Sequence, residues 1–134
     1  MQELQKICRG YNVTALYAFG SRAAELLRAL EDDSYSFQSS VSDLDVGILT
    51  QSSFPVESKV GLTLDLENLF NAPRVDLVIL QEADSFLAAN IVRGERVYTA
   101  DSYLADEYEL FVLSRAGDLA ELERERMAMI LQEG

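Results

Sequence analysis

The stretch SSVSDLDVGIL, residues 39–49, decides how the fold is interpreted, because an otherwise apolar, strand-like run carries two carboxylates. Successive side chains of a strand point to opposite faces, so Asp43 and Asp45 share one face while Leu44 and Val46 share the other. Two carboxylates roughly 7 Å apart on a half-buried face repel each other. The pattern indicates either a partly solvated edge strand or a site for a divalent cation, since Mg²⁺ is usually held by one or two carboxylates together with substrate phosphates.

A strand, a glycine turn and a helix precede this stretch. VTALYAFG, residues 13–20, has strand composition, and SRAAELLRALE, residues 21–31, repeats apolar residues at helical spacing after Ser21, a predicted N-cap. A strand that turns at Gly20 into a helix presents backbone N–H groups and the positive end of the helix dipole, which favour an anion. Ser21 could donate a hydrogen bond to a phosphate oxygen, and Arg22 could neutralise its charge. The alternative is an ordinary turn with an N-cap, because the Gly-Ser dipeptide is common.

A third strand is predicted in RVDLVIL, residues 74–80, where Asp76 is the single acid in an apolar run. Taken alone, Asp76 reads as a turn acid between a helix and a strand. If its strand neighbours the strand of Asp43 and Asp45, however, three carboxylates converge. Two could then hold a metal ion, while the third could ligate a second metal or take a proton from a hydroxyl.

The remaining pattern completes a mixed order of helices and strands. Residues 56–71 fit either strand alternation or helical spacing, and their length favours a helix. The other predicted segments are helices over 2–9 and 83–92, a polar loop over 32–42, an edge strand or extended segment over 96–100, and a helical tail from about 102 with a break or kink at Gly117. This order predicts a single α+β (mixed α/β) domain over residues 1–134, with a small sheet of three to five strands flanked by helices.

Composition narrows the function classes. The chain has 134 residues, a formal net charge of −12, no histidine and one cysteine, Cys8, so a zinc or Cys/His catalytic site is disfavoured and Cys8 is expected to be an inert core residue. The acidity disfavours direct nucleic-acid binding and favours a basic protein partner, although it could also serve solubility alone. With no leader and no apolar run of membrane length, a cytoplasmic protein is expected.

Three motifs together resemble the minimal nucleotidyltransferases of the DNA polymerase β superfamily. They are FGSR at 19–22, SDLDV at 42–46 and VDLV at 75–78, and IVRGERVYTA at 91–100 followed by a helix is also similar to that family. The resemblance implies Mg²⁺-dependent transfer of a nucleoside monophosphate, commonly AMP from ATP, to a hydroxyl with release of pyrophosphate. One departure is the connection from Arg22 to Ser42, whose 21 residues exceed the family's usual length.

The resemblance also assigns roles to residues. Gly20 and Ser21 match the family's triphosphate-binding turn, and Arg22 lies beside them. Asp43 and Asp45 match its metal ligands, and Asp76 its third carboxylate, which would also suit the base that activates the acceptor. The resemblance therefore implies a site in which Gly20, Ser21 and Arg22 bind the nucleotide. The other members of this site, which are implied to be catalytic and to ligate metal, are Asp43, Asp45 and Asp76.

The family further implies a partner. Its minimal members often act as antitoxins paired with HEPN-type ribonuclease toxins, which some adenylylate on a tyrosine, and this chain is about the right size. Three alternatives stay open: a nucleotide-binding antitoxin that neutralises its partner by contact alone, a transferase for a small hydroxyl compound, and a purely structural α/β protein. A homodimer formed through the helical tail is also open. No membrane association is expected.

Overall fold

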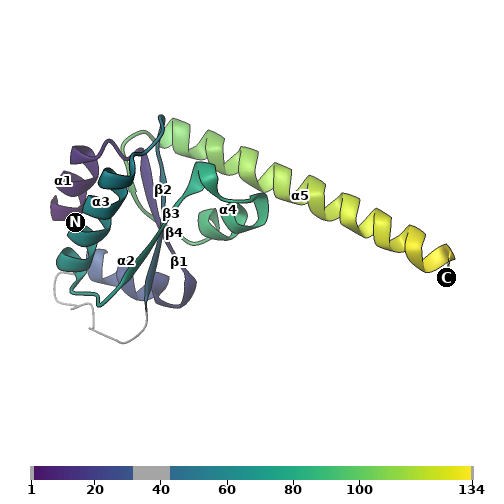
Figure 1. The fold of residues 1–134 in the computed structure, drawn as a ribbon, viewed down its shortest axis with the longest axis horizontal. Helices are drawn as coiled ribbons and strands as arrows, with labels where there is room; N and C mark the ends of the chain where they lie inside the picture. Colours follow the sequence, from purple (N-terminus) through teal and green to yellow (C-terminus); the bar gives the residue numbers. More distant parts are fainter. Residues whose placement is uncertain (1, 32–42, 134) are drawn as a thin grey trace.

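The structure, a computed structural model, describes residues 2–31 and 43–133 and is built on a four-stranded sheet (Figure 1). The strands lie in the order β3-β2-β1-β4. Central β1 is antiparallel to both β2 and β4, whereas β2 and β3 are parallel. The strand bounds are β1 Ala15–Phe19, β2 Leu44–Leu49, β3 Val75–Ile79 and β4 Glu95–Thr99. The predicted sheet of three to five strands is therefore confirmed.

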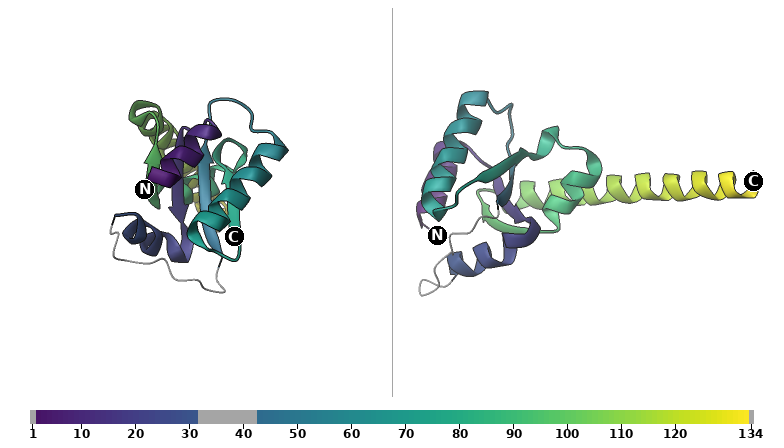
Figure 2. Two further views of the ribbon diagram at one scale, coloured as in Figure 1. Left: turned by 90° about the vertical axis from the view of Figure 1, so that its left-hand side faces the viewer. Right: turned by 60° about the horizontal axis from the view of Figure 1, so that its bottom comes forward.

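Helices cover both faces of this sheet, so the described strands are sandwiched between two layers (Figures 1 and 2). One apolar cluster joins the sheet to the first three helices, and a second joins its opposite face to the last two. The helix bounds are α1 Gln2–Gly10, α2 Ala23–Glu31, α3 Val56–Phe70, α4 Ser85–Val92 and α5 Ser102–Glu133. Helix α5 packs on the sheet with its first half and then projects away from the body (Figure 1).

The alternation of side chains on β1 explains why both faces are covered. Leu16 and Ala18 point into the cluster with α1, α2 and α3, whereas Ala15 and Tyr17 point into the cluster with α4 and α5. All four side chains are fully buried. Burial on both faces is what an apolar run without polar alternation predicts.

The ambiguous segment 56–71 is a helix, as predicted. Leu62, Leu66 and Phe70 recur every fourth residue and are buried against the sheet, whereas Leu64, which contributed to the strand-like alternation, is exposed. The helix ends at Asn71, whose φ of 50° is left-handed. The apolar residues at helical spacing, which are buried, thus decide the structure of this segment, and the alternating pattern of leucines does not.

Helix α4 passes very close to β2. A Cβ at Gly47 would lie 2.5 Å from Cγ2 of Ile91, so only glycine lets the helix approach the strand this closely. Asp84 caps α4, its side chain accepting a hydrogen bond from the Leu87 N–H at 2.9 Å. The close approach fixes α4 against the strand that carries Asp45.

Two predictions about helix ends are wrong. Ser21 is not an N-cap, because Gly20–Arg22 forms a 3-10 turn and α2 begins only at Ala23. Gly117 does not break the tail, because α5 runs unbroken from Ser102 to Glu133. A glycine costs a helix only about 1 kcal/mol relative to alanine, which the good helix formers around it offset. The predicted loop over 32–42 lies outside the described residues.

The single cysteine behaves as expected. Cys8 lies on the buried face of α1, and burial raises the pKa of its thiol to about 12. The thiol therefore stays protonated and unreactive at neutral pH. None of the helices in the described part of the chain combines the length and apolar composition that a bilayer crossing requires.

Candidate functional site

Three of the predicted site segments meet at one end of the sheet. Phe19, the last residue of β1, pairs with Asp45 on β2, and Asp45 pairs with Asp76 on β3. Gly20 follows Phe19 directly. The strand order β3-β2-β1 therefore places the glycine turn, Asp45 and Asp76 side by side, although Gly20 and Asp76 lie far apart in the sequence.

Gly20 and Asp45 are in particularly close contact. Gly20 has a φ of +77°, which side chains rarely adopt, and a Cβ on it would lie 2.5 Å from Oδ2 of Asp45. Any larger residue would thus be strained and would push against the carboxylate. The glycine turn is required here both by its backbone conformation and by its neighbour.

The three carboxylates interact electrostatically. Asp45 is half-buried, and its pKa is raised first by burial and then by the negative charges of Asp76 and Asp43. These causes place both other carboxylates within electrostatic reach of Asp45. A cation bound among them would relieve the repulsion that raises this pKa.

Asp43 has a basic neighbour that the sequence did not reveal. Nε of Arg74 lies 3.7 Å from Oδ2 of Asp43, and both side chains are well exposed, so this pair contributes little to stability. Arg74 immediately precedes Val75, which pairs with Leu44 in the parallel β2–β3 register. Knowledge of that register would have placed Arg74 beside Asp43, because residues that precede paired parallel positions lie side by side.

Ser21 and Arg22 lie in the 3-10 turn but differ in their surroundings. Ser21 is exposed, so its hydroxyl is accessible to a ligand. Arg22 is only 5% exposed, and its Nε and Nη2 donate hydrogen bonds to the Glu25 carboxylate at 3.3 and 3.2 Å. The sequence analysis missed Glu25, although acid and base three residues apart on a helix are neighbours.

The donor set fits Mg²⁺, although it is not a closed cage. Within residues 2–31 and 43–133, no group of three or more acidic, cysteine or histidine side chains is arranged to hold a metal ion by itself. Mg²⁺ commonly keeps several waters and takes one or two carboxylates plus phosphate oxygens. Asp45 lies against the glycine turn, and together with Asp43 it could provide that kind of incomplete oxygen site.

The chain belongs to the polymerase beta nucleotidyltransferase family. The family model described as "Polymerase beta, Nucleotidyltransferase" matches residues 2–103, which include all six predicted site residues. The resemblance seen in the three sequence motifs is thereby confirmed. No curated protein matches the chain.

Several solved structures share the fold. A chain of a toxin–antitoxin crystal structure with AMP-PNP is 23% identical, with a TM-score of 0.65 over 96% of this chain and 94% of that one. A chain from the tri-AMPylated Shewanella oneidensis HEPN toxin in complex with MNT antitoxin is 22% identical, with a TM-score of 0.59 over 97% and 96%. A chain of the toxin–antitoxin MntA-HepT is 21% identical, with a TM-score of 0.60 over 96% and 92%. The fold of this chain is therefore also found in such complexes.

Proposed function

We propose that this protein transfers AMP from ATP to a hydroxyl group of a HEPN-type protein partner and thereby acts as the antitoxin of a toxin–antitoxin pair. The observation that carries the proposal is the meeting of Gly20, Asp45 and Asp76 at one sheet end in a chain of the nucleotidyltransferase family. Phosphate-binding backbone and carboxylates on adjacent strands are the two parts that nucleotidyl transfer requires.

Each site residue has a role in this reaction. The turn at Gly20 offers backbone N–H groups to the triphosphate, and the exposed Ser21 hydroxyl donates to a phosphate oxygen. Asp43 and Asp45 would hold Mg²⁺, which when bound neutralises charge on the phosphates and on the leaving pyrophosphate. Arg22 adds positive charge at the start of α2, where Glu25 orients its guanidinium.

In this proposal Asp76 accepts the proton of the acceptor hydroxyl. Its side chain is exposed, and the residue is paired with Asp45 across the β2–β3 ladder. As the acceptor oxygen forms its bond to the α-phosphorus, the bond from that phosphorus to the pyrophosphate oxygen breaks. Asp76 takes the hydroxyl proton and the pyrophosphate leaves with the bonding electron pair.

The partner assignment draws on the fold relatives and on charge. The HEPN toxin named in one similar structure is tri-AMPylated and is in complex with an MNT antitoxin. The net charge of −12 favours a basic partner over another acidic one. A partner protein with a reactive hydroxyl fits both observations.

A second candidate is an antitoxin that binds nucleotide and neutralises its partner by contact alone. Two observations favour it: the acidic side chains of the described residues do not form a closed metal group, and Arg22 is already paired with Glu25. A site in this arrangement could bind nucleotide without transferring it. This candidate requires the same protein partner but no transfer of AMP to it.

Nucleotide titration tests the proposal against this candidate. We expect the chain to bind ATP in a Mg²⁺-dependent manner in calorimetry, and the double variant Asp43→Asn, Asp45→Asn to bind at least roughly tenfold more weakly, because the metal ligands are lost. Equal ATP binding by the double variant would contradict the metal site. If that variant still neutralises the HEPN-type protein in cells, contact alone is sufficient and the second candidate is correct.

A further inference from the structure

Helix α5 exposes an unusual amount of apolar surface. Every described side chain from Glu121 to Gln132 is exposed, and this part of the helix projects away from the body in Figure 1. Most of the exposed large apolar side chains in the described chain lie on α5: Tyr103, Leu110, Phe111, Leu119, Leu122, Met127, Met129, Ile130 and Leu131. Exposed apolar surface of this extent marks an interaction site, and a helix without packing is marginal in water.

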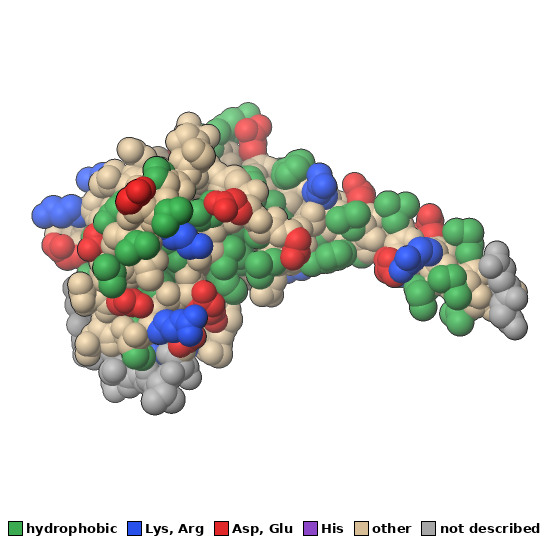
Figure 3. Space-filling model, in the orientation of Figure 1, with side chains coloured by type: hydrophobic (Ala, Val, Ile, Leu, Met, Phe, Trp, Pro, Cys, Tyr) green, Lys and Arg blue, Asp and Glu red, His purple; other side chains and the backbone are tan. Residues whose placement is uncertain are grey.

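Many of these side chains share one face. With 3.6 residues per turn, the face of Tyr108 and Val112 continues through Leu119 and Leu122 to Ile130. Val112 is buried on this face against the body, whereas Leu122 is 60% exposed. We call this face the α5 stripe: Tyr108, Phe111, Val112, Leu119, Leu122, Met129 and Ile130. The stripe shares Tyr108 and Val112 with the apolar cluster that packs α5 on the body, and it continues beyond the body. Figure 3 shows hydrophobic side chains along the projecting part of this helix.

A cavity adjoins the α5 stripe where the helix leaves the body. It has a volume of about 890 Å³ and lies between α4 and α5, with Phe86, Phe111 and Leu119 in its lining. Arg115 lies at this cavity, where its Nε donates a hydrogen bond to Oγ of Ser85 at 3.0 Å. A cavity of this size and apolar lining suits large apolar side chains of a partner.

The cavity lies on the same face of the sheet as the carboxylates. Asp45, Gly47 and Leu49 are alternate residues of β2 and therefore lie on one face, which α4 covers. Leu49 belongs to the apolar cluster of α4 and α5. Leu44, Val46 and Ile48 belong to the opposite face. A protein seated between α4 and α5 would therefore be bound on the side of the molecule that presents Asp45 and Asp76.

A second copy of this chain is a poor occupant. The run Glu123–Arg126 consists of four consecutive charged residues, and a coiled-coil seam recurs at steps of three and four. Every heptad register must therefore place at least one of these charges in the seam, where a parallel second copy would present the same charge. Each copy also carries a net charge of −12.

The charges around the α5 stripe describe the partner instead. Asp118 and Glu125 lie one turn to either side of Leu122, on one edge of the stripe, and make that edge negative. Arg126 lies between Leu122 and Ile130, where its Nη2 is paired with Oε1 of Glu123 at 2.7 Å. A partner that offers an apolar ridge with flanking lysine or arginine side chains would match both features.

We propose that the α5 stripe and the cavity between α4 and α5 form the docking surface for the acceptor protein, which inserts an apolar ridge flanked by basic residues. This inference rests on the proposed function for the identity of the partner. It adds the place of binding, the chemistry of the bound surface and the reason why α5 projects from the body. Docking here holds the acceptor on the carboxylate side of the sheet.

Affinity measurements with matched variants test this proposal. The probe is the purified HEPN-type protein from the same genome, measured against the full chain without nucleotide. Leu122→Glu and Phe86→Glu, one on each side of the proposed surface, are expected to raise Kd by roughly tenfold or more, because each puts a charge in an apolar contact. Leu110→Glu is the control, since Leu110 is 68% exposed on the same helix but on its opposite side.

The outcomes separate this inference from the proposed function. Unchanged binding by Leu122→Glu and Phe86→Glu overturns the docking surface, even if AMP transfer occurs. Weakened binding by both, without AMP transfer by the wild type, supports the surface and contradicts the enzyme. A wild-type chain that does not bind the HEPN-type protein, or a homodimer that Leu122→Glu dissociates in light scattering, overturns the partner assigned to this surface.

Discussion

Asp45 and Asp76 pair directly across the parallel β2–β3 ladder, so that two carboxylates stand side by side on neighbouring strands. Asp76 is one of the charges that raise the pKa of Asp45. Such an arrangement costs stability in the absence of a cation and is useful when one binds. The chain thus maintains an unfavourable pair at the point where the glycine turn ends β1.

Replacing Asp45 should therefore stabilise the protein without metal. The pKa of Asp45 in the folded state is raised above its usual 3.8. Between the unfolded-state pKa and the folded-state pKa, the native protein therefore binds more protons than the unfolded chain, so its stability falls as the pH rises and Asp45 ionises. We expect Asp45→Asn to melt about 1–3 °C above the wild type at pH 7, a small gain because the site is partly solvated. The difference should vanish near pH 3, where wild-type Asp45 is protonated.

Scanning calorimetry of the two proteins across this pH range checks the prediction. Asp118→Asn, on the projecting half of α5, serves as the control and should not shift the melting temperature at pH 7. Mg²⁺ should raise the melting temperature of the wild type more than that of Asp45→Asn. An Asp45→Asn variant that is less stable than the wild type at pH 7 would show that the carboxylates do not repel each other as described.

Gly20→Ala should impair both stability and nucleotide binding. The new Cβ would meet Oδ2 of Asp45 at 2.5 Å in a left-handed backbone, so the turn must move away from the carboxylate. We expect a loss of roughly 1–3 kcal/mol in unfolding free energy, and weaker ATP binding. Denaturant titration and calorimetry measure the two effects.

Gly117→Ala is the matched control for this variant. A Cβ at Gly117 meets nothing within 4 Å, and the residue lies inside a helix, so alanine should add about 0.5–1 kcal/mol of stability. Its ATP binding should equal that of the wild type. If Gly20→Ala bound ATP as well as Gly117→Ala does, the turn at Gly20 would not be the phosphate site.

The approach of α4 to β2 can be tested by a double-mutant cycle. Gly47→Ala should cost about 1–3 kcal/mol, because its Cβ would lie 2.5 Å from Cγ2 of Ile91. Ile91→Ala removes that methyl group and should cost about 2–5 kcal/mol through the cavity it leaves. The double variant should be less destabilised than the sum of the two, and strict additivity would mean that the two residues do not touch.

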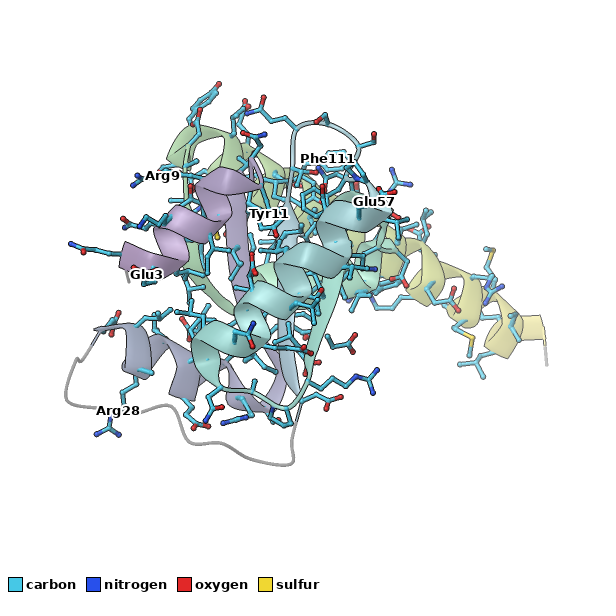
Figure 4. The ribbon with its side chains drawn as sticks, turned by 60° about the vertical axis from the view of Figure 1, so that its left-hand side comes forward. Glu3, Arg9, Tyr11, Arg28, Glu57 and Phe111 are labelled. Atoms are coloured by element: carbon cyan, nitrogen blue, oxygen red, sulfur yellow. The ribbon has the colours of Figure 1, made fainter. Side chains whose placement is uncertain are left out.

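Tyr17 should hold the base of α5 on the sheet. Its hydroxyl donates a hydrogen bond to Oε2 of Glu109 at 2.8 Å, and Nη1 of Arg96 donates to the same oxygen at 2.7 Å. We expect Tyr17→Phe to cost about 0.5–1.5 kcal/mol and to speed hydrogen exchange over residues 105–116. Tyr11 lies on the other side of the sheet, between α1 and α3 (Figure 4), and its hydroxyl donates a hydrogen bond to Asp65. Tyr11→Phe should cost a similar amount without that change in exchange.

Local patterns were sufficient to predict most of the fold. The apolar runs around Leu16, Val46 and Leu77 predicted β1, β2 and β3, because buried strands have a composition that can be recognised without a partner. The continuity of α5 through Gly117 was missed, since one glycine costs less than the surrounding helix gains. The start of α2 was also missed, because short 3-10 turns are frequent at the N-termini of α-helices and residue spacing does not separate the two.

The site was predictable only in part. The spacing of Asp43 and Asp45 was enough to predict that they share one face. Whether Asp76 lies beside them depends on the order of the strands, which no local signal encodes. The contact between Gly20 and Asp45 depends on the same non-local pairing. The pairing of Arg22 with Glu25 could have been inferred from their i, i+3 spacing, whereas the approach of Arg74 to Asp43 could not have been inferred without the β2–β3 register.

The most direct test of the account is the intact mass of the HEPN-type protein after incubation with this chain, ATP and Mg²⁺. We predict that its mass increases by one or more adenylyl groups with the wild type, that pyrophosphate is released in equal amount, and that Asp43→Asn, Asp45→Asn produces neither change. An unmodified mass under conditions in which the two proteins form a complex would contradict the central claim of nucleotidyl transfer.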